Sequence, residues 1–289
     1  MATARQSRLR FGVLTYPEHV TYREIVQTWH EIDDAGFDSA FVFDHFIPFT
    51  GSSNGPCLEG WTLLSALAAQ TKQARVGVLV TGNTYRHPAL LAKMAATVDH
   101  VSNGRLILGL GAGWYEQEHR MYGFPFPTAG DRARQLREAV KVLKHLFTRE
   151  KSTFTGKYYQ LKDAPFAPKA LQKPHPPLLI GGTGPKVLLP LAARQANIWH
   201  FYGGSEAESM RQTCAAFDAV CQKVGRNPNE VEKATSLSPS QLSGSAKEVV
   251  ARLRGIADTG IGHLIIELSQ PYDRQFLQRF AKDIMPEFR

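Results

Sequence analysis

The sequence reads Leu79-Val-Thr-Gly-Asn-Thr-Tyr-Arg-His-Pro88 and then, after a helical segment, Gly104-Arg-Leu-Ile-Leu-Gly-Leu-Gly-Ala-Gly-Trp114. This pattern predicts a strand, a helix that begins at Pro88, and a second strand over residues 105–110. Proline suits the first turn of a helix because no amide hydrogen is needed there, and Asn103-Gly104 supplies a left-handed stop. A strand, a helix and a strand in this order form a parallel βαβ unit.

The rest of the chain repeats this alternation of short apolar runs and amphipathic segments. Capping boxes mark three of the expected helix starts: Thr21 with Glu24, Ser205 with Glu208, and Ser245 with Glu248. Strands are expected at residues 11–15, 39–43, 74–80, 105–110, 178–180, 196–201, 231–237 and 264–266. Eight strands, each followed by a helix, favour a closed (β/α)8 TIM barrel of the α/β class over a doubly wound sheet. We therefore predict a single barrel domain over residues 1–289.

Residues 148–176 are the least regular part of the chain. They fall between the fourth helix and the fifth strand, and they hold a possible hairpin around residues 154–159 and a proline-rich run. We interpret this segment as an insertion and predict that it covers the barrel mouth, since long insertions often carry substrate contacts. Pro190 falls inside the next expected helix, which it should bend or shorten.

Composition narrows the class of protein. No apolar run approaches the ~18 residues needed to span a membrane, and residues 1–10 lack the apolar core of a secretory signal. Cys57, Cys214 and Cys221 are odd in number and lack CxxC spacing, which argues against a disulfide framework or a zinc site and for a cytoplasmic setting. The net charge of +8 comes from scattered basic residues, so a small anionic ligand is a better match than nucleic acid.

Polar and glycine-rich residues follow the strands, at the edge where barrel active sites lie. His45 could act as an acid, a base or a metal ligand, or could simply be a hydrogen-bonded pocket residue. Glu116 and Glu118 could belong to the site or could pair with Arg120 and Arg132 in a solvated loop. The other candidates are Asp44, Thr81, Asn83, Gly111, Gly113, Trp114, Gln117, Gly181 to Gly184, Trp199 and His200.

The glycines among these candidates allow specific contacts. Gly111 and Gly113 permit a flat ring to approach the backbone closely, and Gly181-Gly-Thr-Gly184 could present amide hydrogens to a phosphate or could be a plain tight turn. The chain has no HExxH motif, P-loop or nucleophile elbow. The residues alone therefore predict a barrel with an anionic, partly planar ligand, and they leave the reaction open.

Besides residues 79–88, the sequence contains the motifs Gly36-Phe-Asp-Ser-Ala-Phe-Val-Phe-Asp-His45, Leu91-Ala-Lys-Met-Ala-Ala-Thr-Val-Asp99, Ser102-Asn-Gly-Arg-Leu-Ile-Leu-Gly-Leu-Gly-Ala-Gly-Trp114 and Pro177-Leu-Leu-Ile-Gly-Gly-Thr-Gly184. Together these motifs resemble those of the bacterial luciferase-like monooxygenase superfamily, and in particular its branch of coenzyme F420-dependent oxidoreductases. The resemblance implies a (β/α)8 barrel that binds F420, an 8-hydroxy-5-deazaflavin, in the cleft at the strand ends. It also implies a homodimer.

The resemblance also implies roles for individual residues. Asp44 and His45 match a catalytic pair beside the reactive face of the ring, and His45 becomes the candidate for proton transfer. Thr81 falls in a bulge of the third strand where a non-proline cis peptide is often found. The implied cofactor-binding residues are Asp44, Thr81, Gly111, Ala112, Gly113, Gly181, Gly182 and Gly184.

The sequence departs from this branch at one informative position. The sugar-phosphate dehydrogenases of the branch have a glutamate directly after the fourth-strand Gly-x-Gly, and Trp114 stands there in this chain. The first hypothesis is an F420-dependent oxidoreductase that transfers a hydride between the deazaflavin carbon 5 and a small organic substrate. The alternatives are an oxygen-activating FMN-dependent monooxygenase served by a separate flavin reductase, and a flavin-binding barrel without catalysis.

Overall fold

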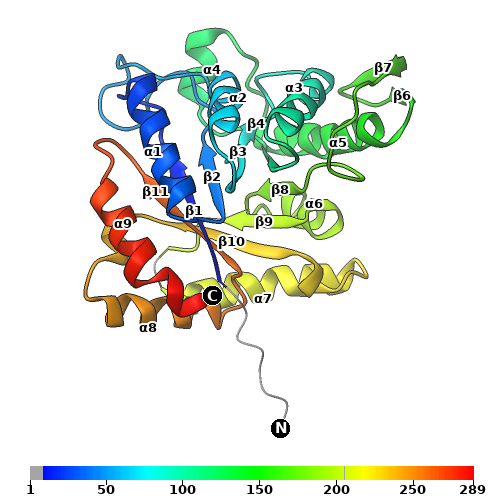
Figure 1. The fold of residues 1–289 in the computed structure, drawn as a ribbon. Coiled ribbons are helices and arrows are strands. Elements are labelled where there is room, and N and C mark those ends of the chain that lie inside the picture. The colour runs from blue at the N-terminus through cyan, green and yellow to red at the C-terminus, as the bar shows by residue number, and fades with distance from the viewer. Residues whose placement is uncertain (1–8, 205) are drawn as a thin grey trace.

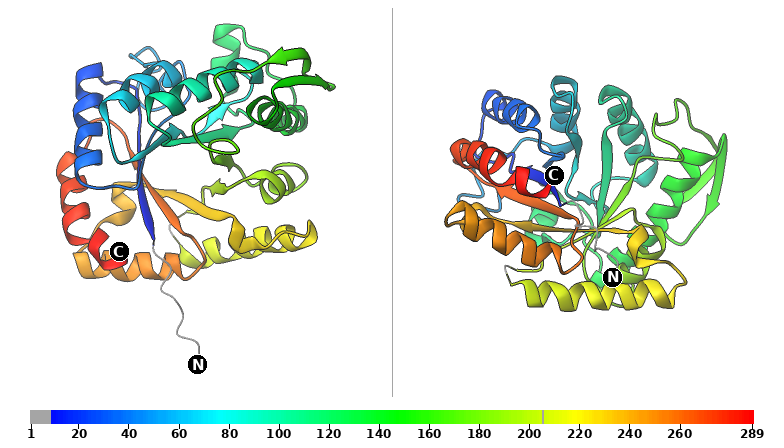
Figure 2. Two further views of the ribbon diagram at one scale, coloured as in Figure 1. Left: turned by 45° about the vertical axis from the view of Figure 1, so that its right-hand side comes forward. Right: turned by 60° about the horizontal axis from the view of Figure 1, so that its bottom comes forward.

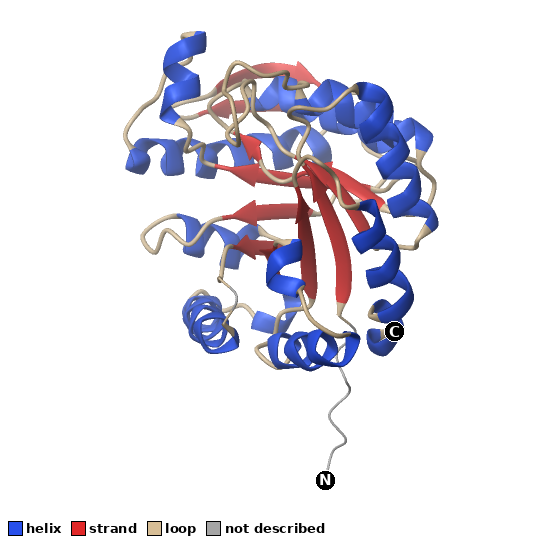
Figure 3. Ribbon diagram, turned by 90° about the vertical axis from the view of Figure 1, so that its left-hand side faces the viewer, coloured by secondary structure: helices blue, strands red, loops and turns tan. Residues whose placement is uncertain are grey.

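The computed structural model describes residues 9–204 and 206–289, in which parallel strands form a closed barrel inside a ring of helices (Figures 1 and 3). The sheet runs in the order β3-β2-β1-β11-β10-β9-β8-β5-β4, and pairing of β3 with β5 closes it. This confirms the predicted (β/α)8 barrel. Its strands are β1 (Arg10–Thr15), β2 (Ser39–Val42), β3 (Arg75–Val78), β4 (Thr81–Gly82), β5 (Leu106–Gly111), β8 (Leu178–Gly181), β9 (Ile198–Phe201), β10 (Glu232–Leu237) and β11 (His263–Leu268).

The helices that cover the barrel follow the predicted alternation (Figure 2). The Thr21–Glu24 and Ser245–Glu248 capping boxes are both present, whereas Ser205 lies outside the described residues. Pro190 occupies the first turn of a short helix, where its missing amide hydrogen costs nothing. The helices are α1 (Tyr22–Asp34), α2 (Gly60–Gln70), α3 (Pro88–Val101), α4 (Glu116–Tyr122), α5 (Ala129–Thr148), α6 (Leu188–Gln195), α7 (Ala207–Lys223), α8 (Ala246–Ala257) and α9 (Arg274–Asp283).

Alternate residues of each strand enter two separate apolar layers. Val13 and Val42 face outward and join the large cluster between strands and helices, whereas Leu14, Phe41 and Phe43 face the barrel axis. The inner cluster is small and ends at the carboxyl edge of the strands with Phe43 and Leu79. Side chains beyond these two residues are therefore placed to line a site rather than to fill the barrel.

The third strand of the barrel is interrupted and forms two short strands, β3 and β4, although residues 74–80 were predicted as one strand. β3 ends at Val78, the Leu79–Val80 peptide bond is cis, and β4 resumes at Thr81. β3 pairs with β2 and β5, and Thr81 and Gly82 of β4 pair with β5. The cis peptide that the resemblance implied is thus present, in the bulge directly before Thr81.

Residues 148–176 leave the barrel between α5 and β8 and contain the expected hairpin. Its strands β6 (Lys151–Thr155) and β7 (Gln160–Pro165) pair antiparallel and lie beside α5, at the upper right of Figure 1. Tyr159, at the turn side of the hairpin, accepts a hydrogen bond from the Asn83 side chain at 3.0 Å. This contact joins the insertion to the loop after β4. Cover of the barrel mouth by the insertion stays a prediction.

None of the described helices is long and apolar enough to cross a membrane.

Candidate active site

A cleft crosses the carboxyl ends of the strands and consists of two adjoining cavities. The first has a volume of about 320 Å³ and is lined by His45, Asp44, Thr81, Tyr85 and Glu267, among others. The second, of about 300 Å³, extends past Ala112 toward the loop after β8. The two cavities share the lining residues Leu79, Val80, Gly111, Gly113, Trp114 and Tyr202.

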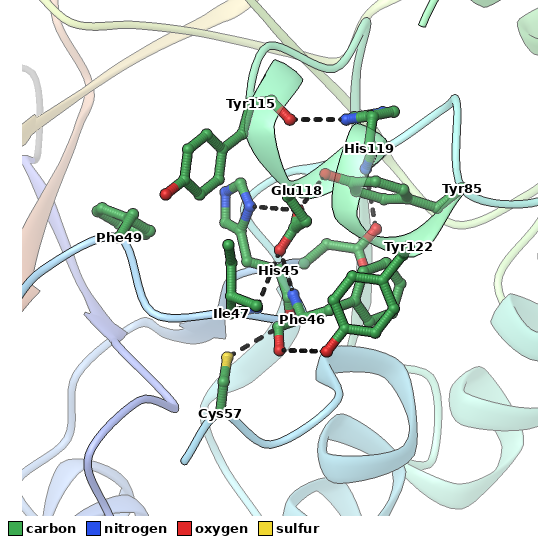
Figure 4. A network of polar contacts seen from close by, with 12 residues as sticks. His45, Phe46, Ile47, Phe49, Cys57, Tyr85, Tyr115, Glu118, His119 and Tyr122 are labelled. Carbon is green, nitrogen blue, oxygen red and sulfur yellow. Dashed lines mark hydrogen bonds and ion pairs between the residues drawn. The ribbon is translucent and has the colours of Figure 1, made fainter. Parts of the chain in front are cut away.

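His45 follows β2 and is held by a carboxylate from another part of the chain. Its Nδ1 atom lies 3.0 Å from Oε2 of Glu118, which belongs to the short helix α4 (Figure 4). The Glu118 side chain is fully buried, and that of His45 is 11% exposed. Oε1 of the same carboxylate accepts hydrogen bonds from the backbone amides of Phe46 and Ile47, and Oε2 accepts one from the Tyr85 hydroxyl.

These contacts fix the charge on Glu118 and, through it, the orientation of the imidazole. Burial by itself would raise the pKa of the Glu118 carboxyl, but the hydrogen bonds from His45, Tyr85 and Phe46 outweigh burial and lower it. An ionised carboxylate can only accept hydrogen bonds, so Nδ1 of His45 must carry the hydrogen between them. In the neutral ring Nε2 is then an acceptor, on a side chain that lines the first cavity.

The two roles left open for the glutamates after β5 are divided between them. Glu116 pairs with Arg120 at 2.7 Å on the exposed side of α4, as expected for a solvated contact. Glu118 does not pair with Arg132, because α4 turns it inward to His45. Residues 115–123 were not predicted as a helix. The available signal was Gly123, whose left-handed conformation ends α4.

Asp44 is buried beside His45, but both of its oxygens are already engaged. Arg86 donates to Oδ2 at 2.6 Å and to Oδ1 at 2.9 Å, and the amide of Gly82 donates to Oδ2 at 2.9 Å. The carboxylate thus ties the end of β2 to the bulge that contains Val80. Thr81 lines the cleft and accepts a hydrogen bond from the Trp61 indole at 3.1 Å.

An apolar slot lies where the two cavities meet, over the bulge and the end of β5. A methyl group added at Gly111 would stand 2.5 Å from Cγ2 of Val80, and one at Gly113 would stand 2.6 Å from Oγ1 of Thr84. Both distances are far below van der Waals contact, so glycine at these positions is what lets Val80 and Thr84 pack closely against the backbone at the end of β5. Trp114 follows at the rim, 63% exposed and stacked on Tyr115. Glycine backbone and the apolar side chains of Leu79 and Val80 therefore line the slot.

The loop after β8 forms the far end of the second cavity. Gly181, Gly182 and Thr183 line it, and Gly182 has a φ of +114° that other residues rarely adopt. Gly184 lies in the same turn, where its carbonyl accepts the amide of Leu189 at 3.0 Å. The helix α6 begins at Leu188, three residues after Pro185.

Trp199 and His200 were both predicted at the end of the sixth strand, and their side chains point to opposite sides of it. His200 lines the second cavity and bonds the Ser236 hydroxyl at 2.8 Å, and burial lowers its pKa to about 3. Trp199 points the other way, into the core, where it stacks on Phe217 at a ring distance of 4.1 Å. The alternation of side chains along a strand explains the separation.

Sequence reasoning missed Glu267, which lines the first cavity from the end of β11. Its Oε1 atom is shielded from water and has no hydrogen-bond partner among the described residues. Burial is the main influence on this carboxyl and raises its pKa, although the neighbouring hydroxyls of Tyr16, Tyr202 and Ser236 oppose the rise. The signal in the sequence was its place directly after Leu264-Ile-Ile266, at a strand end like His45.

Comparison with known proteins identifies a matching family and several related enzymes. A family model described as luciferase-like monooxygenase matches residues 8–258. The chain is 26% identical to an F420-dependent glucose-6-phosphate dehydrogenase of Amycolatopsis mediterranei, over 97% of this chain and 99% of the relative. It is 30% identical to an FMNH2-dependent dimethylsulfone monooxygenase of Pseudomonas putida, over 68% of this chain and 52% of that protein.

The structure also resembles that of an F420-dependent secondary alcohol dehydrogenase solved in complex with an F420-acetone adduct. The TM-score is 0.85 at 21% identity, and the match covers 98% of this chain and 99% of the other. This likeness extends over nearly the whole of both chains, and it supports the barrel fold.

Proposed function

The chain belongs to the luciferase-like monooxygenase family, and from this premise we propose that it is an F420-dependent oxidoreductase acting on a small organic substrate. The observation that carries the proposal is the imidazole of His45, held by an ionised carboxylate at the edge of a cleft that contains a glycine-lined slot. Support for the cofactor comes from the relatives, among which F420-dependent enzymes match over almost the full length of the chain.

The slot is a suitable place for the deazaflavin. Val80 in the bulge would support the ring, Gly111, Ala112 and Gly113 would line it, and Gly181, Gly182 and Gly184 would hold the phosphate end. Bound F420 accepts or supplies a hydride at carbon 5. We assign Asp44 a positioning role, since its carboxylate is occupied by Arg86 and Gly82 and holds the bulge in place.

His45 would handle the proton that accompanies the hydride. When an alcohol is oxidised, its carbon loses a hydride and its hydroxyl loses a proton, and we propose that Nε2 of His45 takes that proton. The negative charge of Glu118 would stabilise the resulting imidazolium. In the reverse direction the imidazolium would return the proton to a carbonyl oxygen. The proton and the hydride together account for both hydrogens that the substrate loses.

The first test is to measure the affinities for F420 and FMN side by side by isothermal titration calorimetry. We expect F420 to bind more tightly than FMN, and we expect the reduced or oxidised F420 complex to react with ketones or alcohols without consuming oxygen. Tight FMN binding with oxygen consumption, and weak F420 binding, would overturn the proposal.

The second candidate function is an FMN-dependent monooxygenase. Its support is the 30% identity to the FMNH2-dependent enzyme of Pseudomonas putida over residues that make up 68% of this chain. An enzyme of this kind would consume oxygen when a flavin reductase supplies reduced FMN. Oxygen uptake under these conditions distinguishes the two functions directly.

We also expect a homodimer, as the resemblance implies, and a reducing cytoplasmic environment, as the free cysteines suggest. Light scattering of the purified protein would test the first expectation, and localisation of the tagged protein in its own cell would test the second.

A further inference from the structure

The first cavity is lined by polar groups from the two strands that flank β1. His45 follows β2, Glu267 lies near the end of β11, and β1 pairs with both strands. The ring of Tyr16, which follows β1, contacts Phe43 and Phe49, which also contact each other; the centroid distances are 5.1–5.3 Å, and Phe43 and Phe49 both lie edge-on to His45. A ligand that reaches from His45 to Glu267 must therefore pass along an apolar wall.

The lining of this cavity offers little to an anion. Among the described residues that line it, none is a lysine or an arginine. The guanidinium of Arg86, which lies beside the cavity, is 8% exposed and is bound to Asp44. Phosphate groups are normally held by cations or by rows of backbone amides. The cavity instead contributes the carboxyl groups of Asp44 and Glu267.

One oxygen of Glu267 lacks the partner that a buried carboxyl oxygen normally has. Oε1 is shielded from water and has no hydrogen-bond partner among the described residues, and an unpaired buried polar atom costs free energy. The side chain as a whole is only partly buried and lines the cavity, so the carboxyl group can reach a ligand there. The surrounding hydroxyls come from three other segments, through Tyr16, Tyr202 and Ser236. Burial raises the pKa of Glu267 and so favours the protonated form, which can donate a hydrogen bond.

We propose that Glu267 is a specificity-determining residue that selects a neutral substrate, an alcohol or ketone with an apolar body and a second oxygen. The reacting oxygen would lie at His45, the apolar body would lie along Tyr16, Phe43 and Phe49, and the second oxygen would accept a hydrogen bond from Glu267. This inference rests on the proposed function. It assigns this chain a substrate class different from the phosphorylated sugar in the name of its Amycolatopsis relative.

The test uses the complex with oxidised F420 and three probe molecules. Cyclohexane-1,4-dione carries a second oxygen, cyclohexanone lacks it, and glucose 6-phosphate is anionic. Their dissociation constants are measured by calorimetry for the wild type, Glu267→Leu and Glu267→Gln. The matched control is Glu208→Gln, which changes a carboxylate that is 70% exposed at the start of α7.

We expect the wild type to bind the dione more tightly than cyclohexanone, and glucose 6-phosphate most weakly. Glu267→Leu should weaken dione binding about tenfold, the value of one lost hydrogen bond, and should leave cyclohexanone binding within about twofold. Glu267→Gln keeps a donor and should stay close to the wild type, as should the control. A selective effect on one probe separates a substrate contact from general damage to the fold.

Three results would overturn the inference: equal dione binding by the wild type and Glu267→Leu, tighter binding of glucose 6-phosphate than of the dione, or no binding of either ketone. If Glu267→Leu does not fold, the dissociation constants of Glu267→Gln and the order of the three probes in the wild type still test the inference. Affinity for F420 is measured first in each protein. Failure of the wild type to bind F420 would count against the proposed function, whereas normal F420 binding with the wrong probe order would count against Glu267 alone.

Discussion

At the scale of single residues, the proposed chemistry depends on the imidazole of His45. We expect His45→Ala to lower kcat by about 10²–10⁴-fold, the usual contribution of a positioned acid or base. The affinity for F420 should change little, because the slot is built by the bulge and the glycines. Steady-state kinetics together with calorimetry would measure both effects.

The control for this variant is His30→Ala, which removes an exposed imidazole from α1. It should leave both kcat and F420 affinity at the wild-type values. Near-normal turnover by His45→Ala with a working substrate would show that the proton moves by another route.

We expect the contribution of Glu118 to the stability of the fold to depend on pH. Burial alone would raise its pKa, but the hydrogen bonds from His45, Tyr85 and Phe46 lower it below the unfolded value of about 4.3. A lowered pKa in the folded state contributes stability above the unfolded pKa, and this stability is lost as the pH falls through the folded pKa. At pH 7, Glu118→Gln should therefore cost about 1–3 kcal/mol of unfolding free energy.

Urea denaturation of the wild type and Glu118→Gln across the acidic range would measure this difference. The gap between the two proteins should shrink below about pH 4. A gap that stays constant with pH would mean that packing, rather than the charge of the carboxylate, is what the substitution removes.

The sequence identified the site residues that directly follow a strand and belong to recognisable motifs. His45, Thr81, Gly111 and Gly113 all line the cleft as expected. Glu118 was assigned to either of two roles because its partner is 73 positions away in the sequence, and only the turn of α4 brings them together. Glu267 was missed because one acidic residue at the end of an apolar run carries no motif.

At the scale of elements, the buried ion pair of Asp44 and Arg86 joins β2 to the segment between β4 and α3. Asp44→Leu would leave the Arg86 guanidinium buried without its main partner, and such a change costs about 3–5 kcal/mol. Asp44→Leu with Arg86→Met removes both charges and should recover much of that loss. Chemical denaturation of the two single variants and the double variant would give the coupling energy.

The matched comparison for this pair is Arg254 and Glu287, whose side chains are about half exposed. Removing either partner there should change stability by no more than about 1 kcal/mol. If the loss of unfolding free energy in the double variant equals the sum of the losses in the two single variants, the pair does not act as a unit.

The elements themselves were largely predictable, with two instructive exceptions. Apolar runs bounded by glycine and polar residues located all eight barrel strands, because each strand is buried on both faces. The break at Leu79–Val80 was visible only through the family resemblance, since nothing in the local apolar pattern distinguishes it. The seven-residue helix α4 is too short for helical periodicity to show and is held by tertiary contacts.

At the scale of the whole molecule, the net charge of +8 should favour an anionic cofactor. The deazaflavin F420 carries an acidic tail, and long-range attraction to it is screened by salt over a distance of about 10 Å at 0.1 M. We expect the dissociation constant of F420 to rise several-fold between low and high salt. A deazaflavin without the tail should bind with little salt dependence, and calorimetry of both ligands would test this.

The overall architecture followed from the regular alternation of strands and helices, because a closed parallel barrel buries every strand of such a chain. The pairing that closes it, between β3 and β5, joins residues from a single βαβ unit. What could not be derived is the arrangement of the loops at the mouth. Their conformations depend on contacts such as that of Tyr159 with Asn83, which link segments far apart in the sequence.

Because of where the four tryptophans lie, the intrinsic fluorescence of this protein can report binding in the cleft. Trp29, Trp61 and Trp199 are at most 2% exposed, whereas Trp114 is 63% exposed at the rim of the cleft. Iodide should therefore quench the emission of one indole and leave the other three bright. A ligand that settles beside Trp114 would shield it, so the loss of iodide quenching would report occupancy of the cleft before any substrate is known.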